Sequence, residues 1–360
     1  MAVFDRIGAD ENEQVVFCHD RSSGLRAIIA IHSTHLGPAL GGARFYPYAD
    51  EDAALADVLN LAQAMTYKAA AAGLDLGGGK AVILGDPATT KTEALLRAYA
   101  RHVDNLGGRY IKAEDVGTSQ ADMDLIRTET SHVTGVSESL GGSGDPSGPT
   151  AYGVVWAMKA VARHLWGDTS LAGRHVVMSG VGKVGGYLVG HLVEEGARVS
   201  VADVDPSAVA RAVSLHGAGA VAVEAAHRTV CDIYSPCALG GALDPTTIAE
   251  LQCAAVVGSA NNQLAHPDCA TLLVDAGVLY VTDYVVNAGG LINIAEELAP
   301  GGYSRDRAYA AVQAIFDTTT TLLAMAENAA VSTSEVAGQL AERRMHEPSD
   351  GHLIRPASRG

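Results

Sequence analysis

The stretch Val176-Val-Met-Ser-Gly180-Val-Gly-Lys-Val-Gly-Gly186 decides the fold of the second half of the chain. A strand-like run meets a G-x-G-x-x-G turn, after which a helix can begin. The first glycine permits the tight bend, the second lets a pyrophosphate approach the backbone, and the third lets helix and strand pack closely. The N-terminus of the helix then faces the phosphate charge. The predicted cofactor contacts are Gly180, Val181, Gly182, Lys183, Val184, Gly185 and Gly186.

A lone match of this kind also fits an ordinary loop, because the chain contains 40 glycines. Asp203 favours the dinucleotide interpretation. It ends the next strand-like run about 20 residues further on, where a carboxylate can accept hydrogen bonds from ribose hydroxyls. Such a carboxylate would repel a 2′-phosphate, so the sequence predicts NAD rather than NADP. The alternative is a solvated Asp at the end of a strand.

Short β-like runs alternate with helix-length segments through the second half of the chain. This alternation is typical of a doubly wound parallel sheet. Helical stretches are also expected from Thr150 through Val161, over 305–328 and over 332–344, and a weakly ordered tail is expected from Glu347. The predicted strands are 174–179, 198–202, 221–223, 232–234, 254–257 and 279–282.

The first half also mixes strands and helices. Two apolar runs flank turn formers and predict a hairpin, and the spacing of apolar residues over 52–72 predicts an amphipathic helix. A glycine loop should follow that helix. The remaining expected elements are strands at 80–84 and 110–113, a helix over 93–106 and a helix from Ser119.

A turn-rich stretch, 140–149, marks the predicted domain boundary. We expect an α/β protein with an N-terminal α/β domain over 1–145 and a Rossmann-type NAD-binding domain over 146–328. A cleft should separate these two domains. A C-terminal helix and tail, 329–360, should return to the first domain.

Composition excludes several classes of function. At 360 residues, with 48% apolar and 18% charged residues, the chain can build two cores, and it has no apolar run long enough to span a membrane. The net charge of −16 disfavours binding to nucleic acid. The start shows no secretory signal, and the five cysteines are scattered, so we expect a cytoplasmic protein with reduced thiols. Neither the cysteines nor the histidines show metal-ligand spacing, and no metal is expected.

Two lysines bracket a stretch with little side-chain bulk that ends in Gly77-Gly78-Gly79-Lys80. The stretch is not a phosphate-binding Walker loop, because Ala81 follows the lysine where a hydroxyl is needed. If Lys68 and Lys80 share a cleft, burial and mutual repulsion would lower at least one pKa, so that one lysine binds while the other does chemistry. Taken alone, either lysine is more simply a surface charge.

Asp115 follows a strand-like run and precedes Val116-Gly117-Thr118. A carboxylate on such a loop can face the same cleft as the lysines. The alternative is a helix cap, because a helix is expected from Ser119.

Several stretches together resemble one family over nearly the whole chain: the leucine, valine and phenylalanine dehydrogenases of the glutamate dehydrogenase superfamily. The stretch Tyr46-Pro47-Tyr48 is closer to the valine and leucine enzymes. The stretches that carry the resemblance are Leu36-Gly-Pro-Ala-Leu-Gly-Gly-Ala-Arg44, Met65-Thr-Tyr-Lys68, Gly77-Gly-Gly-Lys80, Glu114-Asp-Val-Gly-Thr118, Gly258-Ser-Ala-Asn-Asn-Gln263 and Asp283-Tyr-Val-Val-Asn-Ala-Gly-Gly290.

The resemblance implies that 1–145 is the substrate, catalytic and oligomerisation domain, and it implies a role for each matching residue. Lys68 should bind the substrate carboxylate with the backbone of Gly41 and Gly42. Lys80 should be the general base that activates water, and Asp115 the second acid/base group, acting on the amino or imino nitrogen. Asn261 should touch both the substrate and the nicotinamide. Further cofactor contacts should come from Thr150, Cys237, Ala238, Ser259 and Ala260.

The implied reaction is the reversible, NAD-dependent oxidative deamination of an aliphatic L-amino acid to a 2-oxo acid and ammonia. Aliphatic side chains in the matching stretches favour valine, leucine and isoleucine over an aromatic substrate, and the family suggests a homo-oligomer. Each of these side chains could also belong to the core. The residues expected to line the pocket are Leu40, Met65, Ala113 and Val286, the last beside Val285.

Three alternatives remain open at this stage. The chain could be an L-phenylalanine dehydrogenase of the same family. It could be a 2-hydroxy acid dehydrogenase with His32 or His35 as its base, or a non-catalytic NAD sensor. Two departures from the family pattern, Lys112 before Ala113 and the Gly148-Pro149 pair before Thr150, put the shape of the pocket and of the boundary segment in doubt.

Overall fold

The computed structural model describes residues 4, 6 and 11–346, and these residues form two compact units. The first unit contains the described residues up to Asp145, together with Ile294–Ser304 and the residues from Ala341 onward. The second unit contains Pro146–Asn293 and Arg305–Leu340. The tail predicted from Glu347 lies outside the described residues.

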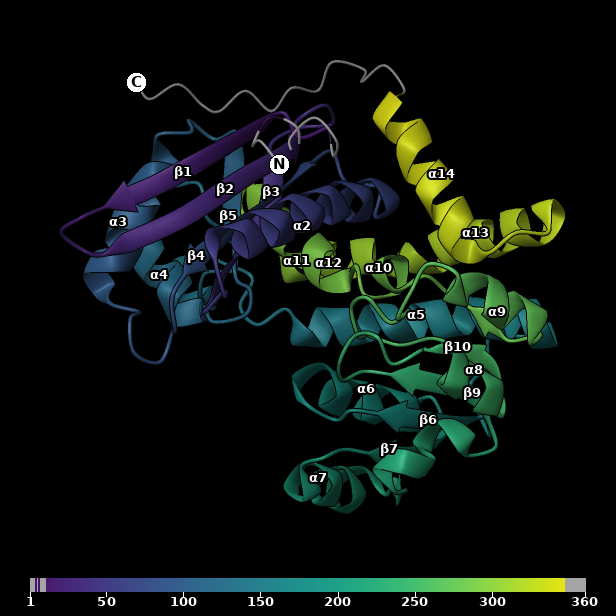
Figure 1. The fold of residues 1–360 in the computed structure, drawn as a ribbon. Helices are drawn as coiled ribbons and strands as arrows, with labels where there is room; N and C mark the ends of the chain where they lie inside the picture. The colour runs from purple at the N-terminus through teal and green to yellow at the C-terminus, as the bar shows by residue number, and fades with distance from the viewer. Residues whose placement is uncertain (1–3, 5, 7–10, 347–360) are drawn as a thin grey trace. The chain divides into compact units, whose positions relative to one another are not determined.

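The first unit is built on a mixed sheet with the strand order β1-β2-β4-β3-β5. The first two strands form the predicted hairpin. β2 also pairs antiparallel with β4, whereas β3 pairs parallel with both β4 and β5 (Figure 1). The strands span Gln14–Asp20 (β1), Leu25–Ser33 (β2), Ala39–Tyr46 (β3), Gly77–Leu84 (β4) and Tyr110–Ala113 (β5).

Helix α2, Glu51–Ala71, lies along one face of this sheet. The Asp50 carboxylate caps its first turn by accepting a hydrogen bond from the Ala53 N–H at 2.7 Å. The apolar stripe that predicted this helix is buried against β2 and β4, and its residues include Leu55, Val58 and Leu59. The predicted amphipathic helix is therefore confirmed.

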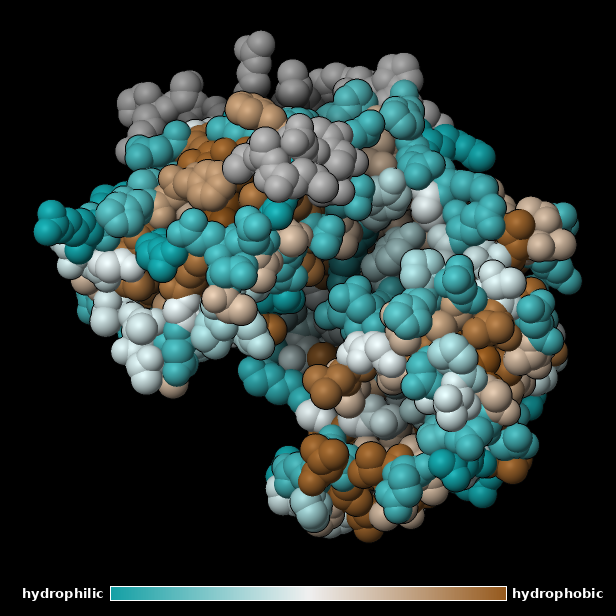
Figure 2. All heavy atoms as spheres, viewed as in Figure 1, coloured by the Kyte–Doolittle hydropathy of each residue, from teal (hydrophilic) through white to brown (hydrophobic). Residues whose placement is uncertain are grey.

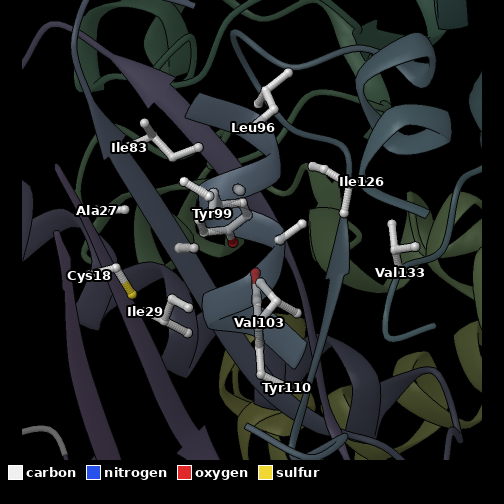
Figure 3. Close-up of a cluster of buried hydrophobic side chains, with 14 of the residues drawn as sticks. Cys18, Ala27, Ile29, Ile83, Leu96, Tyr99, Val103, Tyr110, Ile126 and Val133 are labelled. Atoms are coloured by element: carbon white, nitrogen blue, oxygen red, sulfur yellow. The ribbon is translucent and has the colours of Figure 1, made fainter. Parts of the chain in front are cut away.

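The opposite face of the sheet carries the larger core of the first unit. Helices α3, Glu93–Asp104, and α4, Gln120–Arg127, pack there. Figure 3 shows Tyr99 of α3 and Tyr110 of β5 with their hydroxyl groups directed toward each other. The Tyr110 hydroxyl donates to the Gly41 carbonyl at 2.7 Å, so this core supports the backbone of β3.

Two glycine stretches lie in strands, and one of them, Gly77–Gly79, was predicted as a loop. Gly41 and Gly42 lie inside β3, and Gly77–Gly79 begin β4. Strand neighbours require the absence of side chains there: a Cβ on Gly77 would lie 1.9 Å from the Ser33 oxygen, and one on Gly78 would lie 2.0 Å from the Thr66 nitrogen. The glycines therefore allow close packing between strands and with α2, which a sequence pattern alone does not distinguish from a loop.

The second unit is built on a parallel sheet with the order β11-β10-β9-β6-β7-β8. Counted from β6, this is the Rossmann order, with β6 and β9 on either side of the point where the strand order reverses. The predicted doubly wound sheet is confirmed. Its strands span His175–Ser179 (β6), Arg198–Ala202 (β7), Gly219–Ala220 (β8), Cys231–Pro236 (β9), Cys253–Val256 (β10) and Leu279–Tyr280 (β11).

Helices connect and cover the strands of the second unit (Figure 1). The principal ones are α5 (Ser147–Trp166), α6 (Lys183–Glu194), α7 (Pro206–His216), α8 (Pro245–Glu250), α9 (Cys269–Asp275), α10 (Asp283–Val286), α12 (Arg305–Gln313) and α13 (Ile315–Ala329). The last helix, α14 (Thr333–His346), begins in the second unit and ends in the first. The short helix α11 (Gly289–Ala295) follows α10.

Three predicted segments differ from the structure. The strand expected at 221–223 lies at Gly219–Ala220, because β8 pairs with Ser200 and Val201 of β7 before the chain turns away. The helix expected over 305–328 is interrupted at Ala314, whose N–H bonds to the Ala311 carbonyl in a tighter turn. The boundary segment 140–149 is partly helical, since α5 already begins at Ser147 and accommodates Pro149 in its first turn.

Figure 2 shows hydrophobic side chains at several places on the surface, two of which contain large exposed residues. One is the area over β1 and β2, where Phe17 is 56% exposed. The other is the part of the second unit around α7, where Leu215 is 73% exposed. Among the residues that the structure describes, no helix combines the length and the apolar character needed to cross a bilayer.

Candidate functional site

Lys80 and Asp115 form the centre of the site in the first unit. The Lys80 Nζ atom lies 2.7 Å from Oδ2 of Asp115, and the two side chains are only 9% and 18% exposed. Lys80 lies in the middle of β4, and Asp115 lies on the loop after β5. The structure therefore brings together two residues 35 positions apart that the sequence predicted separately.

Strand alternation places these groups on one face of the sheet. Gly78, Lys80 and Val82 are alternate residues of β4, and Val82 is buried against α2. The Lys80 side chain therefore leaves the strand on the α2 face. On β3, the residues that face the same side are Leu40, Gly42 and Arg44, because Ala39, Ala43 and Phe45 belong to the opposite core.

Gly42 makes room for Asp115. A Cβ on Gly42 would lie 2.6 Å from the Glu114 oxygen and 2.7 Å from the Asp115 Cβ atom. A Cβ on Gly41 would lie 1.7 Å from the Gly79 oxygen. The Gly-Gly pair therefore lets the loop that carries Asp115, and the neighbouring strand β4, approach β3 closely.

Arg44 is a member of this site for which the sequence predicted no role. Its Nε atom lies 3.4 Å from Oδ2 of Asp115, and its Nη1 atom lies 3.0 Å from Oδ2 of Asp57 on α2. Arg44 is the last residue of one stretch that carries the family resemblance, and this position was the one sign in the sequence that it belongs to the site. Its charge and that of Lys80 are balanced by the two carboxylates.

The pKa of the Asp115 carboxyl reflects this environment. Burial raises it, but the Lys80 ammonium and then the Arg44 guanidinium favour the carboxylate, and the result is a pKa below the ordinary value. Asp115 is therefore ionised at neutral pH and can accept a proton.

The loop that holds Asp115 is fastened by Thr118. The Thr118 hydroxyl lies 2.9 Å from both the Asp115 N–H and the Asp115 carbonyl, and 3.2 Å from the Ala43 carbonyl. Helix α4 is capped by Ser119 with Asp122 in a capping box, so Asp115 is not the cap of this helix. The interpretation of Asp115 as a helix cap is wrong.

Lys68 lies in the last turn of α2 and is partly buried, as is Met65. The end of this helix packs directly on β4, because Gly78 leaves space for the Thr66 backbone. Lys68 therefore belongs to the helix end that covers the face from which Lys80 projects. Thr66 also binds the Nδ1 atom of the buried His32 at 2.9 Å, a structural contact for this histidine.

Three of the four predicted apolar pocket residues are well buried, and the fourth, Met65, is partly buried. Leu40 is fully buried and Ala113 is 4% exposed; both belong to the first unit, and Ala113 ends β5. Val286 is fully buried in the second unit on α10. Lys112 is also fully buried but points away from the site, because its Nζ atom contacts the Met123 sulfur on α4. Its side chain therefore does not alter the face that carries Lys80.

In the second unit, the glycine turn joins β6 to α6 as predicted. Gly180 has a φ of +107°, and a Cβ there would lie 2.7 Å from the Ala238 nitrogen. A Cβ on Gly185 would lie 2.3 Å from the Gly180 oxygen, so this glycine allows the helix to pack on the turn. Gly182 faces open space, and no side chain caps the N-terminus of α6. This open helix end fits a dinucleotide pyrophosphate.

Asp203 follows β7 and is oriented by the backbone. Its Oδ2 atom accepts a hydrogen bond from the Val181 N–H at 2.7 Å, and its Oδ1 atom accepts one from the Asp205 N–H at 2.9 Å. The carboxylate therefore stands beside the glycine turn and also tethers it. Each oxygen retains a further lone pair for a ribose hydroxyl.

The other predicted cofactor residues surround the end of this sheet. The Cys237 N–H bonds to the Ser179 carbonyl at 2.7 Å, which places Cys237 and Ala238 beside the glycine turn. Thr150 lies on α5, and its hydroxyl donates to the Pro146 carbonyl at 2.8 Å. Ser259 and Ala260 follow β10.

Asn261 follows the same strand and is exposed. The Asn287 side chain donates to Oδ1 of Asn261 at 2.8 Å and to the Ser259 carbonyl at 3.1 Å. Asn287 therefore positions the Asn261 side chain. The sequence predicted no role for Asn287, although it lies in one of the stretches that carry the family resemblance.

Family models cover most of the chain. The model described as Glu/Leu/Phe/Val dehydrogenase, dimerisation domain, matches residues 12–132. The model described as Glutamate/Leucine/Phenylalanine/Valine dehydrogenase matches residues 141–213 and 206–303. Dehydrogenases of this family generally use NAD(P).

Individual relatives agree with these matches. The chain is 55% identical to a valine dehydrogenase of Streptomyces virginiae over 93% of this chain and 94% of that protein. It is 49% identical to a leucine dehydrogenase of Geobacillus stearothermophilus, with 96% and 94% covered. Among solved structures, L-tryptophan dehydrogenase from Nostoc punctiforme superposes with a TM-score of 0.84 at 40% identity, covering 96% of this chain and 98% of that one.

Proposed function

Since the chain belongs to the glutamate/leucine/phenylalanine/valine dehydrogenase family, we propose that it catalyses the NAD-dependent, reversible oxidative deamination of branched-chain aliphatic L-amino acids. The products are the 2-oxo acid and ammonia. The observation that carries the proposal is the buried contact between Lys80 and Asp115. The absence of a side chain at Gly42 leaves the space that Asp115 occupies.

We assign substrate binding in the first unit to Lys68 and the Gly41-Gly42 backbone. A lysine at the end of α2 offers a positive charge to the substrate carboxylate, and the missing side chains at Gly41 and Gly42 let other groups approach β3 closely. The support for this assignment is the packing of the end of α2 on β4, the strand that also carries Lys80.

We assign the acid–base chemistry to Lys80 and Asp115. The Nζ atom of Lys80 and the Oδ2 atom of Asp115 lie 2.7 Å apart, so a proton can pass directly from the ammonium to the carboxylate. In the direction of deamination, Lys80 passes a proton to Asp115, which carries it to the substrate nitrogen. The neutral Lys80 amine then takes a proton from the water that attacks the imine. Asp115, ionised at rest, exchanges a proton with the substrate nitrogen.

Arg44 and Thr118 hold this pair in place. The Arg44 guanidinium supplies positive charge beside Asp115, and the Thr118 hydroxyl fixes the backbone of the loop. Both are positioning residues, since each acts on Asp115 rather than on the substrate.

We assign cofactor binding to the second unit. The N-terminus of α6 with Gly180–Gly186 would hold the pyrophosphate, and Asp203 the ribose hydroxyls. Contacts from Thr150, Cys237, Ala238, Ser259, Ala260 and Asn261 would complete the site. The bound nicotinamide would supply the acceptor for the hydride of the substrate Cα. The Asp203 carboxylate favours NAD over NADP, because it would repel a 2′-phosphate.

An aliphatic substrate is favoured by the side chains on the Lys80 face. Leu40 and Ala113 are apolar and buried, and Met65 of α2 is apolar and partly buried. The role of Val286, which is fully buried in the second unit, stays a prediction. A pocket of this kind discriminates a methylene by only about 1–3 kcal/mol, so valine, leucine and isoleucine should all react. The named valine and leucine dehydrogenases among the relatives support the same substrate class.

We further propose a homo-oligomer that works in the cytoplasm. Support for the oligomer comes from the match to the dimerisation-domain model and from β1, an edge strand with the exposed Phe17. Support for the compartment comes from five free thiols, which reducing conditions preserve.

Initial rates across a panel of substrates test the proposed function. Purified protein is assayed with L-valine, L-leucine, L-isoleucine, L-phenylalanine, L-glutamate and L-lactate, each with NAD and with NADP. The highest kcat/KM is expected for the three aliphatic amino acids with NAD. A preference for L-phenylalanine, L-glutamate or L-lactate would replace the proposal by the corresponding dehydrogenase.

A further inference from the structure

Two cysteines that the proposed reaction does not use lie side by side in the second unit. Cys231 is the first residue of β9 and Cys253 the first residue of β10, and their Cα atoms are direct partners in this parallel pair. Both side chains pack against the same hydrophobic cluster, which includes Tyr234 and Leu251, so both point to the same face of the sheet. Both are partly exposed.

This register suits a covalent bond between the two sulfur atoms. Neighbouring strands lie roughly 4.7–4.9 Å apart, and disulfides join Cα atoms roughly 4.4–6.8 Å apart. The N–H of Cys231 also bonds to the carbonyl of Gln252 at 3.0 Å, which fixes the backbone beside both residues.

The thiols also differ in reactivity. The Cys231 thiol beside it holds the pKa of the Cys253 thiol below its ordinary value, whereas the neighbouring Cys253 sulfur and burial raise the pKa of the Cys231 thiol. Cys253 is therefore the better nucleophile, and Cys231 is the neighbouring thiol that can form a disulfide with it.

We propose that Cys231 and Cys253 form a redox-sensitive dithiol that hydrogen peroxide oxidises to an intramolecular disulfide, which a thiol reductant can reverse. The Cys253 thiolate attacks one peroxide oxygen, the O–O bond breaks, and the leaving hydroxide takes up a proton to become water. The resulting sulfenic acid is then attacked by the Cys231 sulfur; the S–S bond forms and a second water leaves. Overall, two thiols lose two electrons and two protons, and the peroxide is reduced to two waters.

The modification site is separate from the proposed cofactor residues. Cys231 and Cys253 lie at the N-terminal ends of their strands, whereas the segments with Cys237 and Asn261 follow the C-terminal ends. Oxidation at this pair therefore consumes no group that the proposed reaction needs, and the inference stands independently of the substrate.

Peptide mapping of the full-length protein tests the proposal. The reduced chain is treated with a small excess of hydrogen peroxide, the remaining thiols are alkylated, and the chain is digested without reductant. We expect one cross-linked peptide pair containing Cys231 and Cys253, a loss of two titratable thiols per chain, and recovery of both with dithiothreitol. Cys237→Ser, which removes another partly exposed thiol, should leave this cross-link unchanged, whereas Cys231→Ser or Cys253→Ser should abolish it.

Phenylarsine oxide, which bridges closely spaced thiols, gives a second measurement that requires no oxidation. One arsenic should bind per reduced chain, and preoxidation should prevent this binding. Sulfenic or sulfinic acid at Cys253 without a cross-link, a cross-link to another cysteine, or no arsenic bound by the unmodified chain would each overturn the proposal.

Discussion

The Nζ atom of Lys80 lies 2.7 Å from Oδ2 of Asp115, and both groups leave the sheet of the first unit on the face covered by α2. Because the pair is nearly buried, each charge depends on the other for its stability, and the Asp115 carboxylate also depends on Arg44. A group that is this strongly paired can pass a proton over one hydrogen bond. The predictions that follow concern this site, the glycine turn of the second unit and the buried Lys112.

Lys68→Ala should weaken binding more than it slows the chemistry. If Lys68 holds the substrate carboxylate, the loss of one charge-assisted bond should raise KM by roughly 10- to 100-fold, with a smaller change in kcat. Lys68→Arg keeps the charge and should raise KM less. Steady-state rates with L-leucine check this, and an unchanged KM in Lys68→Ala would remove the residue from the binding site.

Gly42→Ala should displace Asp115. The added methyl group would stand 2.6 Å from the Glu114 oxygen and 2.7 Å from the Asp115 Cβ atom, so the loop must move. A misplacement of about 1 Å can lower kcat by about 10²-fold. Gly338→Ala, on α14 with open space around it, is the matched control and should keep full activity. Equal kcat values for the two variants would refute the proposed fit of Gly42 against Asp115.

Asp203→Ser should relax the preference for NAD. The substitution removes the charge that repels a 2′-phosphate and also the tether to the Val181 N–H. We therefore expect a higher KM for NAD and a ratio of kcat/KM for NADP over NAD that rises about 10-fold or more. Asp205→Asn, which alters the neighbouring exposed carboxylate, should leave this ratio unchanged. If Asp203→Ser keeps the ratio of the unmodified chain, another residue selects the cofactor.

Lys112→Met should stabilise the chain at neutral pH. Burial lowers the pKa of Lys112 from 10.5 to about 7, while Asp122, Glu114 and Asp115 oppose this shift. The unfolded chain therefore binds this proton more tightly, so the lysine destabilises the fold fully below pH 7, and the penalty disappears as the pH rises to about 10.5.

Urea unfolding between pH 6 and 10 measures this effect on the free energy of unfolding. Lys112→Met should be more stable by roughly 2 to 4 kcal/mol near pH 7, and the difference should shrink as the pH rises. Lys91→Met, at a partly exposed lysine paired with Asp122, is the control and should show no comparable trend. A difference for Lys112→Met that stays constant with pH would show that Lys112 carries no penalty.

Patterns that act locally were predicted well from the sequence. The glycine turn, its flanking strand and helix, and Asp203 are near one another in the chain, and the Rossmann topology follows from the alternation of elements. The amphipathic helix α2 is likewise determined by its own spacing. Several matching stretches in one order then identified the family.

Features that depend on distant neighbours were not predicted. The strand character of Gly41-Gly42 and Gly77–Gly79 depends on Ser33, Thr66 and Glu114, which approach only in the folded sheet. The roles of Arg44 and Asn287 have the same origin, because each positions a residue far away in the sequence, Asp115 and Asn261 respectively. A short sequence motif does not predict which distant residue its charged or amide side chain will contact.

The turnover number of Lys80→Ala tests the central claim most directly. Arg44 remains beside Asp115 in this variant, so the carboxylate keeps a positive neighbour, and circular dichroism can confirm the fold. With L-valine and NAD, the kcat of Lys80→Ala should fall by about 10²- to 10⁴-fold. The control variant Lys159→Ala, which breaks an ion pair in the second unit, should keep the kcat of the unmodified chain. A folded Lys80→Ala protein with kcat within a few fold of the unmodified chain would contradict the assignment of Lys80 as the general base.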